Sequence, residues 1–164
     1  MNMISKGAIL AIAMASQAAL SHGPSKHGSS SAAPSEDQEL ATPFGRPGDR
    51  KAVTRTVNIL MSDTMRFSPD RLTVKRGETI RFIVKNDGKL LHEMVLGTEK
   101  SLEEHAALMR KFPEMEHDEP YMVHVAPGKT GDMVWTFDKS GDIGFSCLIP
   151  GHFEAGMTGK VIAK

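Results

Sequence analysis

The sequence has a single cysteine, few aromatic residues and no excess of either charge. Because Cys147 is alone, it cannot form an internal disulfide, so it is a buried inert thiol, a liability or a metal ligand. Twenty Lys and Arg balance twenty Asp and Glu, and no basic block is long enough to bind a nucleic acid. Aromatic residues make up 5% of the chain, so a core must be built mainly from aliphatic side chains and Met. DNA and RNA binding are therefore excluded.

The sequence also lacks an apolar run long enough to span a membrane. Residues 1–21 contain one lysine, an apolar run from Gly7 to Ala15 and then small residues, a pattern typical of a secretory signal peptide. Small residues precede two cleavage points, after Ala18 and after Ser21, and we expect cleavage at Ser21. The sequence therefore predicts a soluble, monomeric periplasmic protein that does not span the membrane and is long enough for one compact domain.

Residues 22–50 are expected to form a disordered or loosely attached arm, ahead of a folded domain at residues 51–164. The arm is rich in Ser, Pro, Gly and charged residues and has almost nothing to bury. It contains His27 and also His22, which cleavage at Ser21 would make the N-terminus. An α-amine and an imidazole on one residue can chelate a metal together, but the sequence favours the simpler explanation that His22 is only the first residue of a flexible tail.

Short segments with alternating apolar residues follow the arm, and turn sequences separate them. The segments are residues 57–61, 72–74, 80–84, 92–96, 133–137 and 143–147. This pattern is typical of an antiparallel β-sandwich, an all-β fold, and the second and third segments are expected to pair as a hairpin. Alternate residues of a strand share a face, so Cys147 is expected to lie with the core residues Ile143 and Phe145.

One segment breaks the β pattern. Residues 101–112 contain Ala, Leu, Glu and Met but no β-branched residue, and Ser101 and Glu104 fit a capping box. We therefore expect one short helix inserted between strands. Residues 113–124, which follow, are irregular and acidic, with several Met and His.

The strongest functional signal lies near the C-terminus, in the sequence CLIPGHFEAGM. Cys147, His152 and Met157 follow one another at intervals of five residues, and Pro and Gly between them let the chain reverse twice. A type 1 copper site needs a thiolate and imidazoles as strong ligands, with a weak axial thioether. His92, which follows a turn and opens a strand, is the candidate for the remaining imidazole.

Each of these residues has a simpler explanation when it is taken alone. A buried Cys usually acts as a small hydrophobic residue, a His near a strand end is usually satisfied within the structure, and a Met usually fills the core. Their joint occurrence at this spacing, just before the last predicted strand, favours the copper site.

These residues resemble the ligands of the cupredoxins, small copper proteins that include plastocyanin, azurin, auracyanin and rusticyanin. The resemblance covers residues 53–164, and the loop is similar to the longer ligand loop of auracyanin and rusticyanin. It implies a Greek-key β-sandwich that holds at least one copper ion, as Cu(I) or Cu(II). The ligands that it implies are His92, Cys147, His152 and Met157. Together with NDGKLLHEMVLGTE and EMEHDEP, the loop resembles exported cupredoxins of bacterial copper tolerance.

One position departs from the better-known electron carriers of this family. Many of them place Asn or Ser directly after the first His ligand, where it steadies the loop that bears the Cys, but here the residue is Glu93. A carboxylate next to the ligands would change their geometry and the reduction potential. We therefore expect the colour of the copper site to shift from blue toward green.

The chain contains more His and Met than one copper site uses, with seven His and eleven Met in all. His105 and Met109 are four residues apart and hence on one face of the predicted helix. Four more candidates follow in the irregular segment: Met115, His117, Met122 and His124. Together these six side chains predict auxiliary copper sites suited to Cu(I), with His22 and His27 as candidates for Cu(II). The alternative is that Met109 packs in the core and the histidines are solvated.

Three functions compete for such a protein. The sequence favours a copper-handling protein that takes part in copper tolerance, because His and Met are in surplus. The alternative is a one-electron carrier between respiratory or photosynthetic partners, with a redox partner docking near His152. A copper oxidase or reductase is the weakest candidate, because multicopper oxidases flank the Cys ligand with His, whereas Ser146 and Leu148 flank Cys147. We therefore do not expect an enzyme, although catalytic oxidation of Cu(I) stays open.

Overall fold

A computed structural model describes residues 41–115 and 117–164. Its strands are β1 (Arg46–Pro47), β2 (Arg55–Ser62), β3 (Arg66–Ser68), β4 (Arg71–Val74), β5 (Glu78–Asn86), β6 (His92–Gly97), β7 (Met122–Val125), β8 (Thr130–Phe137), β9 (Gly141–Ser146) and β10 (Thr158–Ala163). The helical elements are a 3-10 turn, η1 (Arg50–Ala52), and an α-helix, α2 (Glu99–Lys111). The expected signal peptide, most of the expected arm, and both His22 and His27 lie outside the described residues.

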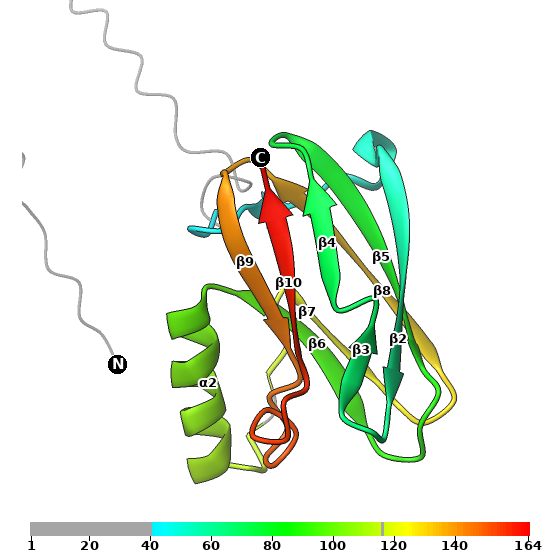
Figure 1. Ribbon diagram of the computed structural model, residues 1–164, viewed down its shortest axis with the longest axis vertical. Coiled ribbons are helices and arrows are strands. Elements are labelled where there is room, and N and C mark those ends of the chain that lie inside the picture. The colour runs from blue at the N-terminus through cyan, green and yellow to red at the C-terminus, as the bar shows by residue number, and fades with distance from the viewer. Residues whose placement is uncertain (1–40, 116) are drawn as a thin grey trace, which may run out of the picture. The chain divides into compact units, whose positions relative to one another are not determined.

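The strands form two five-stranded sheets that pack face to face (Figure 1). One sheet has the order β1-β8-β5-β2-β3 and the other the order β4-β10-β9-β6-β7. Large side chains from both inner faces fill the core, among them Phe82 and Trp135 from the first sheet and Phe145 from the second. The predicted all-β sandwich with one inserted helix is confirmed. The sheets are mixed rather than wholly antiparallel, because β2 pairs parallel with β5 and β4 pairs parallel with β10.

The hairpin predicted for residues 72–74 and 80–84 is wrong, since these segments belong to different sheets. Strand β4 pairs with β10, whereas β5 pairs with β2 and β8. Val74 and Ile80 are both buried, but they enter the core from opposite sides. Alternation shows which side chains face the core and does not show which sheet carries them.

The folded region begins earlier than the predicted boundary at residue 51. Phe44 is buried, its ring stacks on Trp135 with centroids 5.5 Å apart, and its carbonyl accepts a hydrogen bond from the Trp135 indole at 3.1 Å. Strand β1 pairs with β8. The end of the expected arm therefore packs on the sandwich, because one aromatic side chain in a polar segment is enough to anchor it.

Helix α2 covers the outer face of β6 and β9 (Figure 1). It begins at Glu99, two residues before the prediction, and Thr98 caps it by accepting a hydrogen bond from the Ser101 amide at 3.1 Å. The capping box predicted at Ser101 is therefore wrong, because Ser101 already lies inside the first turn. Leu102, Ala106 and Met109 are buried against the sheet. No helix within residues 41–115 and 117–164 is long and apolar enough to cross a membrane.

The position of α2 leaves β6 covered on both sides. Met94 and Leu96 point into the sandwich, while Val95 packs with Leu102 and Leu148 beneath the helix. All six residues of β6 are buried as a result. The strand that begins at His92 is therefore held rigidly at one end of the sandwich.

Candidate metal centre

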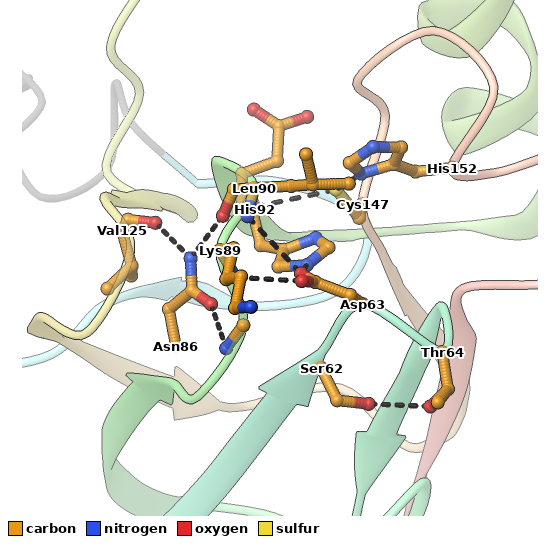
Figure 2. Close-up of polar contacts among 12 residues, drawn as sticks. Ser62, Asp63, Thr64, Asn86, Lys89, Leu90, His92, Val125, Cys147 and His152 are labelled. Atoms are coloured by element: carbon orange, nitrogen blue, oxygen red, sulfur yellow. Dashed lines mark hydrogen bonds and ion pairs between the residues drawn. The ribbon is translucent and has the colours of Figure 1, made fainter.

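Three loops meet at the end of the sandwich where β6 begins, and each brings a polar side chain to the same place (Figure 2). His92 is the first residue of β6 and is fully buried. Cys147 follows directly after β9 and is also fully buried, and His152 lies in the loop from β9 to β10. Asp63 comes from the loop between β2 and β3.

The donor atoms of His92, Cys147 and His152 converge. One ligand atom from each residue lies within 4.8 Å of the others. The Cys147 Sγ and His152 Nδ1 are 3.2 Å apart, and the two imidazole rings have centroids 4.9 Å apart. The Nδ1 of His92 is buried and has no hydrogen-bond partner among the described residues. A buried nitrogen without a partner is costly unless an ion or another group meets it.

Asp63 determines how the His92 ring presents its nitrogens. Its Oδ1 lies 3.1 Å from His92 Nε2, and its carboxylate also accepts hydrogen bonds from the backbone amides of Lys89 and Leu90. The hydrogen bond from Lys89 is the largest cause that lowers the pKa of Asp63, so its carboxylate is charged at neutral pH. A carboxylate at Nε2 favours the tautomer with the proton on Nε2 and a lone pair on Nδ1, the form that binds a metal.

Asn86 holds together the loop that leads into His92. Its side-chain amide donates to the carbonyls of Leu90 and Val125, both at 2.8 Å, and its oxygen accepts from the Gly88 amide at 2.9 Å (Figure 2). Asn86 is fully buried. Neither Asn86 nor Asp63 was predicted as part of the site from the sequence, although Asn86 opens the segment NDGKLLHEMVLGTE, because their roles depend on loops that meet only in the fold.

The Cys147 thiol sits where water does not reach it. Burial is the largest cause that raises its pKa to about 12, so the group is a neutral thiol at pH 7 when no cation is near. A coordinated metal ion deprotonates a thiol outright. The backbone amide of Glu93 also points at Sγ, at 3.5 Å. This environment suits a thiol that becomes a thiolate only when it binds a metal.

The loop from Cys147 to Met157 closes on itself. The Cys147 amide donates to the Met157 carbonyl at 3.1 Å, and the Met157 amide donates to the His152 carbonyl at 3.0 Å. Gly151 and Gly156 have φ angles of 91° and 86°, which other residues rarely adopt, so the predicted reversals occur at these glycines. Met157 is fully buried at the base of the loop.

Glu93 connects this loop to the neighbouring strand. Its side chain is buried, with one oxygen accepting from the Leu148 amide at 2.8 Å and the other 2.7 Å from His124 Nε2. Glu93 and His124 are directly opposite each other on β6 and β7. The carboxylate therefore steadies the Cys147 loop, the task that Asn or Ser performs in many carriers.

The residues of this centre fit copper. A thiol and two imidazoles form a donor set of soft and borderline ligands, which favours copper over the hard cations Mg²⁺ and Ca²⁺. The unpartnered His92 Nδ1 is the sign within the structure that an ion completes the site. The described residues hold no other group of three His, Cys, Asp or Glu ligand atoms this close together.

The structure also brings together the six auxiliary candidates in and after α2. The Nε2 atoms of His105 and His117 are 2.7 Å apart, and the rings of His117 and His124 have centroids 6.2 Å apart. The other three candidates, Met109, Met115 and Met122, line the same surface groove as His117 and His124. Met109 and Met122 are buried in the apolar cluster beneath α2. The alternative that Met109 packs in the core therefore holds for that residue.

Comparison with known proteins agrees with this geometry. The model of a family described as copper binding proteins, plastocyanin/azurin family, matches residues 54–164. The chain is 53% identical over 138 residues to the copper-resistant cuproprotein CopI of Rubrivivax gelatinosus, covering 84% of this chain and 83% of that protein. It is 34% identical over 150 residues to the protein of the same name from Pseudomonas aeruginosa, covering 74% of this chain and 82% of that protein.

Solved structures show the same fold. Reduced auracyanin from Roseiflexus castenholzii matches with a TM-score of 0.59 and 20% sequence identity, covering 68% of this chain and 98% of auracyanin. At this identity the likeness concerns the fold alone. It agrees with the predicted cupredoxin sandwich.

Proposed function

The chain belongs to the plastocyanin/azurin family of copper-binding proteins, the cupredoxins, and we propose that it is a type 1 copper protein that takes part in copper tolerance. The observation that carries the proposal is the convergence of the donor atoms of His92, Cys147 and His152 within 4.8 Å. The two relatives named copper-resistant cuproproteins support the tolerance role.

The proposed ligands are His92, Cys147, His152 and Met157. When bound, copper supplies a Cu(I)/Cu(II) couple, and this donor set is acceptable to both oxidation states. Asp63 orients the His92 ring so that Nδ1 is free to bind. Glu93 fixes the loop that bears Cys147, and burial of the thiol keeps water away. The protein thus holds its ligands in place before the ion arrives, which reduces rearrangement on electron transfer.

We also propose that a redox partner docks at the end of the sandwich near His152. Unlike His92, His152 is only partly buried as a residue. Ile149 and Phe153 lie in the same loop and are partly exposed, and Leu91 is 48% exposed on the neighbouring loop. Apolar surface around a partly exposed ligand favours a transient contact with another protein. The same feature supports the second candidate function, a one-electron carrier.

The place of action follows from residues 1–21, whose pattern is typical of a secretory signal peptide. We propose that the chain is cleaved near Ser21 and works in the periplasm as a monomer. There it would meet copper before the ion enters the cytoplasm.

Growth of a bacterial strain that lacks this protein tests the tolerance role. Expression of the wild-type chain is expected to restore growth in copper, whereas Cys147→Ser is expected to restore none, because the thiolate ligand is lost. Ser146→Ala, a change at the adjacent buried residue, is the matched control and should restore growth fully. Equal growth with wild type and Cys147→Ser would contradict a role for this centre in tolerance.

The carrier function makes a different prediction in the same strain. If the protein only carried electrons, its loss would slow respiratory or photosynthetic electron flow in low copper and would leave copper tolerance unchanged. Measurement of both quantities separates the two functions.

A further inference from the structure

Arg66, the first residue of β3, is not a metal ligand, but it contacts the ligand loop (residues 147–157). Arg66 is exposed, and its Nη1 donates to the carbonyls of Ala155 at 2.9 Å and Gly156 at 3.3 Å. These two residues directly precede Met157, the proposed axial ligand. The same Nη1 donates to the neighbouring carbonyl of residue 65 at 2.7 Å. One guanidinium nitrogen therefore joins β3 to the end of the ligand loop.

The contact between Arg66 and the loop has a local cause. Residues 151–155 form one helical turn, which is closed by a hydrogen bond from the Ala155 amide to the Gly151 carbonyl at 3.1 Å. The last carbonyls of such a turn have no partner inside it, and an arginine near its end can donate to them. Gly156 lets the side chain approach, because a Cβ at this position would lie 3.3 Å from Arg66 Nη1.

The turn that leads into Arg66 also holds the other side of the centre. Asp63 lies in this turn, and its Oδ1 is 3.1 Å from His92 Nε2. A Cβ at Gly88 would overlap the Asp63 carboxylate, so the close approach of the two loops requires glycine there. Residues 62–66 therefore contact both loops that carry ligands, one through Asp63 and the other through Arg66.

The backbone of this turn is held in a strained conformation. Met65 has a φ of 59°, a left-handed value that residues other than glycine rarely adopt. Its amide donates to the Ser62 carbonyl at 2.9 Å, and its side chain packs against the core. The hydroxyls of Ser62 and Thr64 are 2.7 Å apart (Figure 2). Such a conformation persists only where the surrounding contacts fix it, so the turn is suited to hold two loops at a fixed separation.

We propose that Arg66 is a positioning residue of the metal centre, because it holds the Met157 end of the ligand loop against the turn that also holds His92. This inference rests on the proposed function, since it takes Met157 as the axial ligand. The axial ligand tunes the reduction potential of a type 1 centre. A thioether donor stabilises Cu(II) relative to Cu(I), so a less firmly held Met157 raises the potential.

Amide hydrogen exchange of the copper-free protein tests the positioning without any metal. The Met157 amide donates to the His152 carbonyl at 3.0 Å and therefore reports the order of the loop. In Arg66→Ala its exchange should become about tenfold faster, the factor expected when one hydrogen bond to a charged group is lost. Arg66→Lys keeps a cation at this position and should restore part of the protection.

The reduction potential of the copper-loaded protein is the second measurement. The potential of Arg66→Ala should be higher than that of the wild type, and the potential of Arg66→Lys should lie between them. The thiolate band should remain in both variants, because Cys147 and both imidazoles are unchanged, and it also reports that the domain is folded.

Arg71→Ala is the matched control. Arg71 is the exposed first residue of β4, and its side chain forms no hydrogen bond or ion pair with the described residues. Its substitution removes the same charge and should change neither the exchange of Met157 nor the potential.

The outcomes separate this inference from the proposed function. Equal Met157 exchange in wild type and Arg66→Ala would overturn the positioning role, and so would equal effects of Arg66→Ala and Arg71→Ala. Faster exchange with an unchanged potential would overturn it as well, because Arg66 would then only stabilise the loop. A wild-type protein without a thiolate band would instead contradict the proposed centre, and the role of Arg66 with it.

Discussion

Glu93 is the residue next to the first His ligand at which the proposed copper site differs from many electron carriers of the family. It places a carboxylate 2.8 Å from the Leu148 amide and pairs with His124 across two strands. A neutral Asn or Ser at this position could hold the loop but could not bring a carboxylate oxygen to 2.7 Å from His124 Nε2. The position next to the first His ligand was identified from the sequence, but its link to His124 depends on the register of β6 and β7.

Glu93→Gln tests the electrostatic part of this role. The amide oxygen of Gln can still accept from Leu148, so the loop should stay in place while the negative charge near Cys147 is lost. We expect the wild-type visible spectrum to be shifted toward green and the Glu93→Gln spectrum to move toward blue. Absorption spectra of the two copper-loaded proteins provide the measurement. Identical spectra would show that the charge of Glu93 does not affect the ligands.

Asp63 is the second residue whose effect on copper affinity a single substitution can test. Asp63→Ala removes the acceptor at His92 Nε2 and frees the ring to rotate. Residues that orient a metal ligand typically contribute 10–100-fold in affinity, so we expect copper affinity to fall by about that factor. Competition with a copper chelator measures the change.

Asp87→Ala is the matched control for Asp63, since Asp87 is exposed and, among the described residues, its side chain pairs with Lys85 alone. Its copper affinity should equal that of the wild type. A fall of the same size in both variants would mean that general surface charge, and not the orientation of His92, controls affinity.

At the scale of elements, the loop between β9 and β10 was the part most accessible to sequence analysis. Its candidate ligands and its two reversing glycines all lie within the segment from residue 147 to residue 157. Their spacing alone therefore predicted that the loop folds back on itself. Asp63 and Asn86 could not be found this way. Their partners lie on other loops, and only the sandwich brings those loops together.

The sequence correctly predicted that α2 is a helix, but the predicted first residue was two positions too late. The pattern of Ala, Leu and Met is a strong helix signal, whereas Thr98 and Ser101 are both good caps and the sequence alone does not choose between them. The structure chooses Thr98, because the chain leaves β6 at Gly97 and turns immediately over Leu102. A Cβ at Gly97 would lie 2.7 Å from Ser101 Oγ, so this turn requires glycine.

Two leucines of α2 test how the helix is held. Leu102 is buried in the cluster beneath the helix, so Leu102→Ala should lower the free energy of unfolding by about 2–5 kcal/mol. Leu108 is 42% exposed on the same helix, and Leu108→Ala should change the free energy of unfolding by less than about 0.5 kcal/mol. Denaturant titration of both variants checks this difference. Equal effects would mean that α2 does not pack as described.

At the scale of the whole molecule, composition and alternation were enough to predict an all-β sandwich with one helix. They were not enough to assign strands to sheets, as β4 and β5 show, because both strands bury the same kind of residue. They also placed the start of the folded domain too late, since the polar segment before residue 51 is anchored by Phe44 on Trp135. Both errors concern long-range contacts, which local patterns do not contain.

The central claim is that this sandwich holds copper through the Cys147 thiolate. The most direct measurement is the visible absorption of the purified protein after addition of one equivalent of Cu(II), for wild type, Cys147→Ser and Ser146→Ala. The account predicts an intense visible band in the wild type and in Ser146→Ala and its absence in Cys147→Ser. A wild-type protein that binds copper without such a band, or a band that survives in Cys147→Ser, would contradict it.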